Sequence, residues 1–244
     1  MNIAIDVGNT RVKLGVFSAE NKYVNAVLKE EVEDELNFIF SKYDSIYKSI
    51  VSASGKIDQK WINLLKEKTQ LHVFSPSSKV PFISNYTTPK TLGLDRKALV
   101  AAASVNFPLQ NVLVIDLGTC ITYDFIDCKN CYHGGAISPG IKMRFQSMNN
   151  FTENLPLIKK DAKAHRFKSI GNSTENALSI GVFEGIIYEI QGFIKQYRKQ
   201  FNDLTVILCG GDANLLAGRL KNSIFANSNF QLKGLNHILE QNTN

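Results

Sequence analysis

The chain opens with a turn whose residues could hold phosphate and a metal ion. An apolar run leads into Asp6, Gly8 follows within a turn, and Lys13 lies on the next, alternating stretch. Glycine and small polar residues allow a tight turn that aims backbone N–H groups at an anion, while lysine adds positive charge and a carboxylate can hold a metal. An ordinary hairpin with an aspartate at its bend would carry the same residues. The candidate phosphate-binding residues are Asp6, Val7, Gly8, Asn9, Thr10, Arg11, Val12 and Lys13.

The same pattern occurs a second time between residues 114 and 124. An apolar run again leads into an aspartate, Asp116, followed by Gly118, Thr119 and a second run suited to a strand. In a direct alignment of the two copies, Cys120 stands where the first copy has Thr10. An internal repeat indicates two similar halves, which would place two acidic turns around one cleft.

A third glycine element follows a late apolar strand. Gly210 and Gly211 come directly after Val206–Cys209 and before a helical segment. Because glycine has no side chain, a flat base or ribose could approach the backbone closely at this point.

Together these motifs resemble the actin/hexokinase-like kinase superfamily and, within it, the type III pantothenate kinases. The resemblance extends from residue 1 to about residue 220 and implies an α/β fold of two duplicated ribonuclease-H-like domains, 1–108 and 109–244, with an ATP cleft between them. The motifs occur in this order: Asp6-x-Gly8-Asn9-Thr10-x-x-Lys13, Tyr86, Leu92-Gly93-Leu94-Asp95-Arg96, Asp116-x-Gly118-Thr119, Gly134-Gly135-x-Ile137-x-Pro139-Gly140, Leu155-Pro156 and Thr174-x-x-Ala177-x-x-x-Gly181.

The residues Asp95 and Arg96 open a helix after a stretch rich in Pro, Ser and Thr. One interpretation is a helix cap with a neighbouring surface charge. The other is an aspartate that accepts a proton from a substrate hydroxyl, beside an arginine that binds an anionic oxygen. The resemblance favours the second interpretation and implies that Asp95 is the catalytic base.

The resemblance implies an ATP-binding transferase that converts pantothenate to its 4'-phosphate, the first step of coenzyme A biosynthesis. It also implies that Asp6 holds Mg²⁺, that Asp116 is associated with a monovalent cation (K⁺ or NH4⁺), and that Thr119 lines the phosphates. The implied pantothenate contacts are Tyr86, Gly93, Leu94, Asp95, Arg96 and Thr174, with Thr174 supplied by the partner subunit of a homodimer.

The composition excludes several other classes of protein. The 244 residues are 44% hydrophobic and 20% charged, as in ordinary globular proteins, and the net charge of +6 is spread without a polybasic run, so nucleic-acid binding is not expected. Asp6 interrupts the apolar start, so a signal peptide is not expected. No run of 18 apolar residues occurs, so a membrane span is not expected either, and we expect a cytoplasmic location. The Cys128-x-x-Cys131 pair lacks a second ligand pair for zinc, and we expect a reduced surface turn there.

Several helices and strands must position these residues. Asp58 is expected to cap a helix that ends at Thr69, and Ser173 or Thr174 a long helix that ends near Phe201. On that long helix Gly181 and Gly185 would allow a partner helix to approach closely, and Phe183 and Ile187 beside the main apolar stripe indicate a second buried face. A two-fold partner would cover it, so we expect a homodimer.

Two alternatives remain open at this level. A related kinase or phosphatase acting on a sugar or polyphosphate would lack the Tyr86 and Gly93–Arg96 arrangement, which is present. A non-catalytic regulator with the same fold would have lost Asp6, Asp95 or Asp116, and all three are present.

Overall fold

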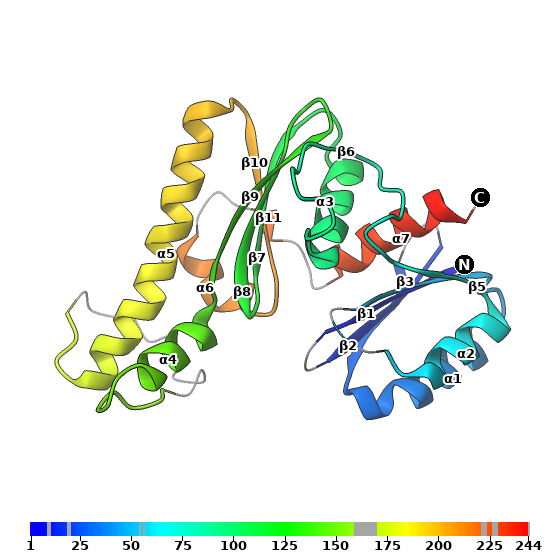
Figure 1. Ribbon diagram of the computed structural model, residues 1–244, viewed down its shortest axis with the longest axis horizontal. Helices are drawn as coiled ribbons and strands as arrows, with labels where there is room; N and C mark the ends of the chain where they lie inside the picture. The colour runs from blue at the N-terminus through cyan, green and yellow to red at the C-terminus, as the bar shows by residue number, and fades with distance from the viewer. Residues whose placement is uncertain are drawn as a thin grey trace. The chain divides into compact units, whose positions relative to one another are not determined.

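The computed structural model describes residues 1–244 except 9–10, 19–20, 54, 56, 159–169, 221–223, 226–228 and 244. The chain forms two compact units (Figure 1). Unit 1 comprises residues 1–108, 129–133 and 229–244, and unit 2 comprises residues 109–128 and 134–228. The C-terminal segment therefore packs with unit 1, which a simple boundary at residue 108 does not anticipate; the division into domains 1–108 and 109–244 stays a prediction.

Unit 1 is built on a five-stranded sheet in the order β3-β2-β1-β4-β5. The central strand β1 pairs antiparallel with β2 and parallel with β4. The strands are β1 (Asn2–Val7), β2 (Val12–Phe17), β3 (Asn21–Val27), β4 (Lys48–Ala53) and β5 (Gln70–Val73), and the other elements are η1 (Lys29–Glu31), α1 (Val32–Lys42), α2 (Gln59–Lys68), the short strand β6 (Ile83–Ser84), α3 (Leu94–Asn106) and α7 (Phe230–Asn242).

Helices cover both faces of this sheet. In Figure 1, α1 and α2 lie against one face and α7 against the other. Leu36, Ile39 and Leu65 bury the inner faces of α1 and α2 against the alternating apolar residues of β1 and β2. Asp58 caps α2 by accepting a hydrogen bond from the N–H group of Lys60 at 2.9 Å, as the sequence predicts. Gly234 lets α7 approach α3 closely, because a Cβ atom there would overlap the carbonyl of Ala98.

Unit 2 repeats this strand order. Its strands follow the order β11-β10-β7-β8-β9, and the short β6 pairs with the start of β9 at the edge of this sheet. Strands β7, β8 and β10 thus occupy the places that β1, β2 and β4 have in unit 1. The duplication confirms the predicted α/β fold with two ribonuclease-H-like halves. The elements are β7 (Asn111–Leu117), β8 (Cys120–Ile126), β9 (Cys131–Pro139), α4 (Ile141–Asn150), α5 (Thr174–Gln200), β10 (Leu204–Cys209), α6 (Ala213–Leu216), η2 (Ala217–Arg219) and β11 (Ile224–Phe225).

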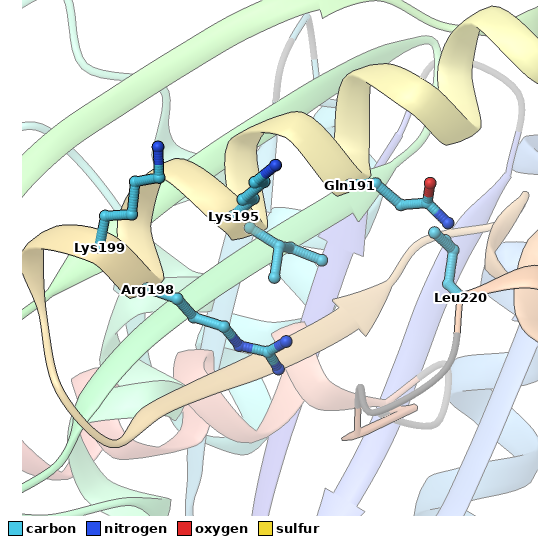
Figure 2. A pocket seen from close by; sticks show the side chains of 6 residues that line it. Gln191, Lys195, Arg198, Lys199 and Leu220 are labelled. Carbon is cyan, nitrogen blue, oxygen red and sulfur yellow. The ribbon is translucent and has the colours of Figure 1, made fainter.

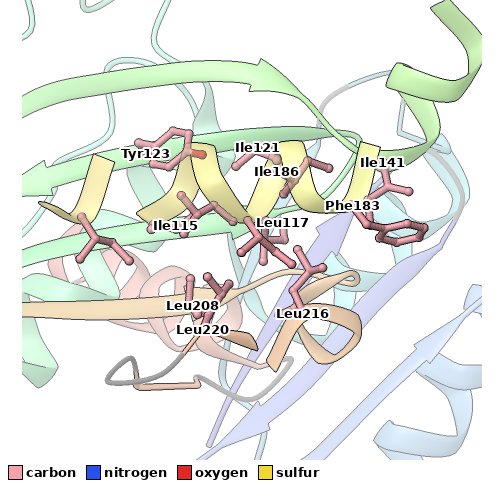
Figure 3. Close-up of a cluster of buried hydrophobic side chains, with 14 of the residues drawn as sticks. Ile115, Leu117, Ile121, Tyr123, Ile141, Phe183, Ile186, Leu208, Leu216 and Leu220 are labelled. Atoms are coloured by element: carbon pink, nitrogen blue, oxygen red, sulfur yellow. The ribbon is translucent and has the colours of Figure 1, made fainter. Parts of the chain in front are cut away.

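The core of unit 2 lies between its sheet and α5 (Figure 3). Ile115 of β7 and Tyr123 of β8 pack there against Ile186 of α5. Phe183 and Ile187 are also buried in this core, each 2% exposed, so the second apolar face expected for the long helix is used within the chain. The argument for a partner subunit from those two residues is therefore wrong.

Helix α5 is long and apolar enough to cross a membrane by length and composition alone. Half of its most apolar 18-residue stretch is buried inside the protein. The helix therefore has the character of a core helix rather than a span.

Candidate functional site

The first acidic turn joins β1 and β2 in unit 1. Asp6 lies directly opposite Lys13 across the antiparallel pair, so the carboxylate and the ammonium group share one face of the sheet. Gly8 closes the turn by donating its N–H to the carbonyl of Arg11 at 3.1 Å. Asn9 and Thr10 lie outside the described residues, so their predicted role stays a prediction.

The second acidic turn joins β7 and β8 in unit 2. Asp116 lies opposite Thr122, and Gly118 donates its N–H to the carbonyl of Cys120 at 3.0 Å. This turn is one residue shorter than the first, since Gly8 bonds to its third successor and Gly118 to its second. Cys120 therefore corresponds to Arg11 and not to Thr10, which corrects the direct alignment. Thr119 is exposed at the tip of this turn.

The third glycine element packs against the second acidic turn. Gly210 has φ +95°, and a Cβ atom there would lie 2.5 Å from a carboxylate oxygen of Asp116 and from the backbone nitrogen of Leu117. The thiol of Cys209 lies 3.8 Å from the same carboxylate oxygen, and Asp212 donates its N–H to the Leu117 carbonyl at 2.9 Å. Gly210 is thus required for the close approach of its own chain to Asp116, whereas the space beside Gly211 is open.

The turn between β9 and α4 supports Thr119 from the other side. Gly140 donates its N–H to the carbonyl of Thr119 at 3.0 Å, and a Cβ atom on Gly140 would overlap the Gly118 carbonyl. Arg144 stabilises the turn between β9 and α4, because its Nε donates a hydrogen bond to the Pro139 carbonyl at 2.8 Å.

Glu189 of α5 links this turn to the core of unit 2. Its carboxylate accepts hydrogen bonds from Tyr123 at 2.7 Å, from Ser138 and from Arg144. Burial alone raises the pKa of the Glu189 carboxyl, but the bonds from Ser138, Arg144 and Tyr123 outweigh it, and the pKa is lowered. Nothing in the local sequence pattern indicates this cluster, because its members come from four separate elements.

Asp95 lies on the first turn of α3 and is exposed to solvent. One of its carboxylate oxygens accepts the backbone N–H of Arg96 at 2.8 Å. Gly93 precedes the helix, and a Cβ atom there would overlap that oxygen. Gly93 occupies the N-cap position of α3, which has no side-chain cap, so Asp95 is the second helical residue and not the cap. Its exposed carboxylate has the accessibility that a base needs.

Tyr86 and Arg96 are brought together in unit 1. The guanidinium carbon of Arg96 lies 5.7 Å from the centre of the Tyr86 ring, a cation–π contact, and Arg96 is only 5% exposed. Leu94 is partly buried at the helix start. The ring of Tyr132, a residue that the sequence does not single out, stacks on the ring of Tyr86 with 5.9 Å between the two ring centres.

Thr174 lies in unit 2, on the first turn of α5, and its side chain is exposed. Ser173 caps the helix, accepting the N–H of Asn176 at 3.3 Å, so the hydroxyl of Thr174 is not needed as the cap.

The donor atoms near the two acidic turns suit hard, oxygen-liganded cations. No cluster of three or more His, Cys, Asp or Glu side chains occurs among the described residues, so an all-protein cage for a transition metal is absent from that part of the chain. Mg²⁺ bound together with substrate phosphates needs only one or two protein carboxylates. The carboxylate of Asp6 could be one of them. Near Asp116, the Thr122 hydroxyl is buried and has no hydrogen-bond partner among the described residues, so a cation at this point would satisfy an otherwise unpaired oxygen.

Two surface pockets of unit 2 contain none of the predicted site residues. One of about 460 Å³ is lined mainly by α5 and is basic (Figure 2). Its lining residues are Gln191, Ile194, Lys195, Arg198, Lys199 and Leu220. The other, of about 340 Å³, lies beside Tyr188 and Glu189.

Comparison with known proteins identifies one family. The family model described as type III pantothenate kinase matches residues 2–196. A type III pantothenate kinase of Flavobacterium johnsoniae is 45% identical over 241 residues, 98% of each chain. The one of Christiangramia forsetii is 46% identical over 243 residues, 99% of each chain.

Solved structures support the fold alone, because their sequence identities are low. A conserved putative Baf family transcriptional activator from Campylobacter jejuni superposes with a TM-score of 0.64 at 20% identity, covering 98% of both chains. The activator of 2-hydroxyisocaproyl-CoA dehydratase from Clostridium difficile, with bound ADPNP, gives a TM-score of 0.58 at 11% identity and covers 98% of this chain and 93% of that one.

Proposed function

Because the chain belongs to the type III pantothenate kinase family, it catalyses the ATP-dependent phosphorylation of pantothenate for coenzyme A biosynthesis, and we propose that Asp95 is its general base. The observation that supports this role is the exposed carboxylate on the first turn of α3, next to Arg96, with Gly93 leaving room for it. A base must reach the proton that it removes, and an exposed carboxylate beside a cation is suited to a hydroxyl on an anionic substrate. Asp95 would accept the proton of the pantothenate hydroxyl as that oxygen attacks the transferred phosphoryl group.

Phosphoryl transfer depends mainly on positioning and on neutralising charge. In our proposal the Asp6–Lys13 turn does both: Lys13 and the backbone N–H groups of the turn bind phosphate oxygens, and Asp6 holds Mg²⁺, which when bound neutralises phosphate charge. Val7, Gly8, Asn9, Thr10, Arg11 and Val12 complete the turn, and Thr119 adds a hydroxyl. The directly opposed carboxylate and ammonium group on β1 and β2 support this assignment.

We assign a monovalent cation, K⁺ or NH4⁺, to Asp116. Its support is the oxygen donor set at the second turn, in which the buried Thr122 hydroxyl stands opposite Asp116 without a described partner. Unlike the first turn, the second places no lysine opposite its aspartate. A cation would supply the positive charge that lysine supplies in the first.

Tyr86, Gly93, Leu94 and Arg96 would contact pantothenate, with Arg96 binding its carboxylate. Thr174 would complete the pocket from the partner subunit of a cytoplasmic homodimer. The support for a dimer is the exposed face of α5, where Gly181, Tyr188 and Gly192 follow one another at helical spacing and the space beside both glycines is open. A second α5 could lie close along that face.

An assay of ADP release tests these roles. With pantothenate, ATP and Mg²⁺ present, we expect turnover that requires K⁺ or NH4⁺ and fails in sodium-only buffer. Asp95→Asn keeps the size of the side chain and removes its basicity, so kcat should fall by about 10²–10⁴-fold while the KM for ATP changes little. Near-normal turnover of this variant would exclude Asp95 as the base, and full activity in sodium would exclude the monovalent cation.

Mixing two inactive variants tests the shared pocket. Asp95→Asn and Thr174→Trp would each be inactive alone. If Thr174 serves the opposite subunit, a mixed dimer regains one working site, so activity should return after subunit exchange. Exchange without recovered activity would place both residues in one chain's site, and a monomer in sedimentation would remove the dimer altogether.

A further inference from the structure

The tip of the hairpin between β8 and β9, residues 129–133, belongs to unit 1, although the strands on either side of it lie largely in unit 2. The tip is bonded to the loop of residues 75–92 that carries Tyr86. Ile83 donates its N–H to the carbonyl of Asn130 at 3.0 Å, and Asn85 donates to the carbonyl of Tyr132 at 2.9 Å. These bonds extend the short parallel pairing of β6 with the start of β9. The loop is therefore fixed along one side by residues that lie 47 positions further along the chain.

Asn130 fastens the tip to both the loop and α3. Its backbone has φ 63°, the left-handed region that asparagine tolerates. Its side-chain amide donates to the carbonyl of Pro81 at 2.7 Å and accepts from the hydroxyl of Ser104 at 2.6 Å. Lys97 of α3 also donates to the loop, at the carbonyl of Pro76, over 2.8 Å. The loop thus has little secondary structure of its own but several fixed points.

Tyr132 touches the side chain of Tyr86 itself. Its ring is fully buried and lies nearly parallel to that of Tyr86, at 17° between planes. Phe82 packs edge-on against Tyr132, with ring centres 5.8 Å apart. Tyr86, which is only partly buried, also carries the guanidinium group of Arg96 over its ring. Tyr86 consequently contacts both the ring of Tyr132 and the guanidinium group of Arg96.

We propose that Tyr132 is a positioning residue for pantothenate: its buried ring holds Tyr86, and through Tyr86 the guanidinium of Arg96, in the orientation that binds the substrate. This inference rests on the proposed roles of Tyr86 and Arg96. A partly exposed tyrosine on an irregular loop would otherwise lose rotamer freedom each time substrate binds, whereas a fixed stacking partner removes that loss before binding.

The test measures steady-state kinetics on the full chain with pantothenate and ATP varied separately. Tyr132→Leu removes the ring, and we expect a KM for pantothenate about tenfold higher, with the KM for ATP unchanged, from the loss of one aromatic pair and one preordered side chain. Tyr132→Phe keeps the ring and should behave as wild type. Phe125→Leu is the matched control, because it removes a buried ring that stacks on Phe201 in the core of unit 2 and is no part of the loop or its contacts; it should lower thermal stability and leave both KM values unchanged.

A double variant separates positioning from general packing. If Tyr132 acts through Tyr86, then adding Tyr132→Leu to Tyr86→Leu should raise the KM for pantothenate no further, whereas independent effects would multiply. Multiplying effects, or equal rises in both KM values, would overturn the inference. If Tyr86→Leu alone leaves the KM for pantothenate unchanged, the proposed role of Tyr86 fails, and the inference fails with it for that separate reason.

A surface variant covers the case in which Tyr132→Leu does not fold. Asn130→Gly keeps the left-handed backbone and removes the bonds to Pro81 and Ser104. Because the tip then holds the loop less firmly, the KM for pantothenate should rise several-fold with no change in the KM for ATP. An unchanged KM for pantothenate in folded Asn130→Gly would contradict the inference.

Discussion

Replacing Thr122 by valine tests the cation assignment directly. The Thr122 hydroxyl is buried without a described hydrogen-bond partner, and valine has nearly the same shape. Leaving a buried polar group unsatisfied costs about 1–3 kcal/mol, so removing it should not destabilise the protein when no cation is bound. In buffer free of potassium and ammonium, we therefore expect Thr122→Val to be as stable as wild type or more stable by about 1 kcal/mol, a rise in Tm of roughly 2–4 °C.

Potassium should reverse this order. A ligand that binds only the folded protein stabilises it by RT ln(1 + [L]/Kd), so wild type gains about 1.4 kcal/mol at ten times its Kd. The valine variant lacks one oxygen donor, binds potassium more weakly, and should gain less. Thr122→Val would then be the less stable protein in potassium.

Thermal unfolding in potassium chloride and in choline chloride, at equal ionic strength, measures both effects. Thr205→Val is the control, since its hydroxyl lies in the same sheet but bonds to Gln110 at 2.7 Å; its response to potassium should match that of wild type. If Thr122→Val is clearly destabilised in choline, the hydroxyl has a partner and the premise is wrong. If potassium stabilises Thr122→Val as much as wild type, Thr122 is not a cation ligand.

Three further substitutions follow from the geometry. Gly93→Ala should lower kcat at least tenfold with Tm nearly unchanged, because its Cβ displaces only the exposed carboxylate of Asp95; normal kcat would contradict this. Gly210→Ala should destabilise the protein by about 2 kcal/mol or more, since alanine is strained at φ +95° and its Cβ meets the backbone of Leu117; denaturant unfolding measures the loss. The lowered pKa of Glu189 stabilises the folded state above the ordinary value of 4.5, and this contribution is lost as pH falls through the folded-state pKa. Glu189→Gln should therefore reduce stability at pH 7 more than at pH 3, and an equal loss at both would show that the charge is not what matters.

Local sequence determined the elements around each acidic turn. The two runs that contain Asp6 and Asp116 predict a strand, a glycine turn and a strand, and the structure forms β1–β2 and β7–β8 there. The sequence also predicted helix starts at Asp58 and at Ser173 or Thr174, and the structure has Asp58 and Ser173 as the caps. These features depend on the backbone preferences and hydrogen bonds of a few adjacent residues, so a short stretch of sequence is sufficient to specify them. The motifs were also sufficient to predict the protein family, because they occur in the same order over most of the chain.

Only the tertiary structure decided which distant segments meet. It placed the hairpin tip with Tyr132 and the C-terminal helix α7 in unit 1, buried Phe183 and Ile187 within the chain, and shortened the second acidic turn by one residue relative to the first. It also gathered the partners of Glu189 from four elements. Periodicity reports that a face is apolar, but the segment that covers the face depends on the path of the chain through its loops and on the fit of side chains across the core, and neither leaves a repeating signal in the sequence.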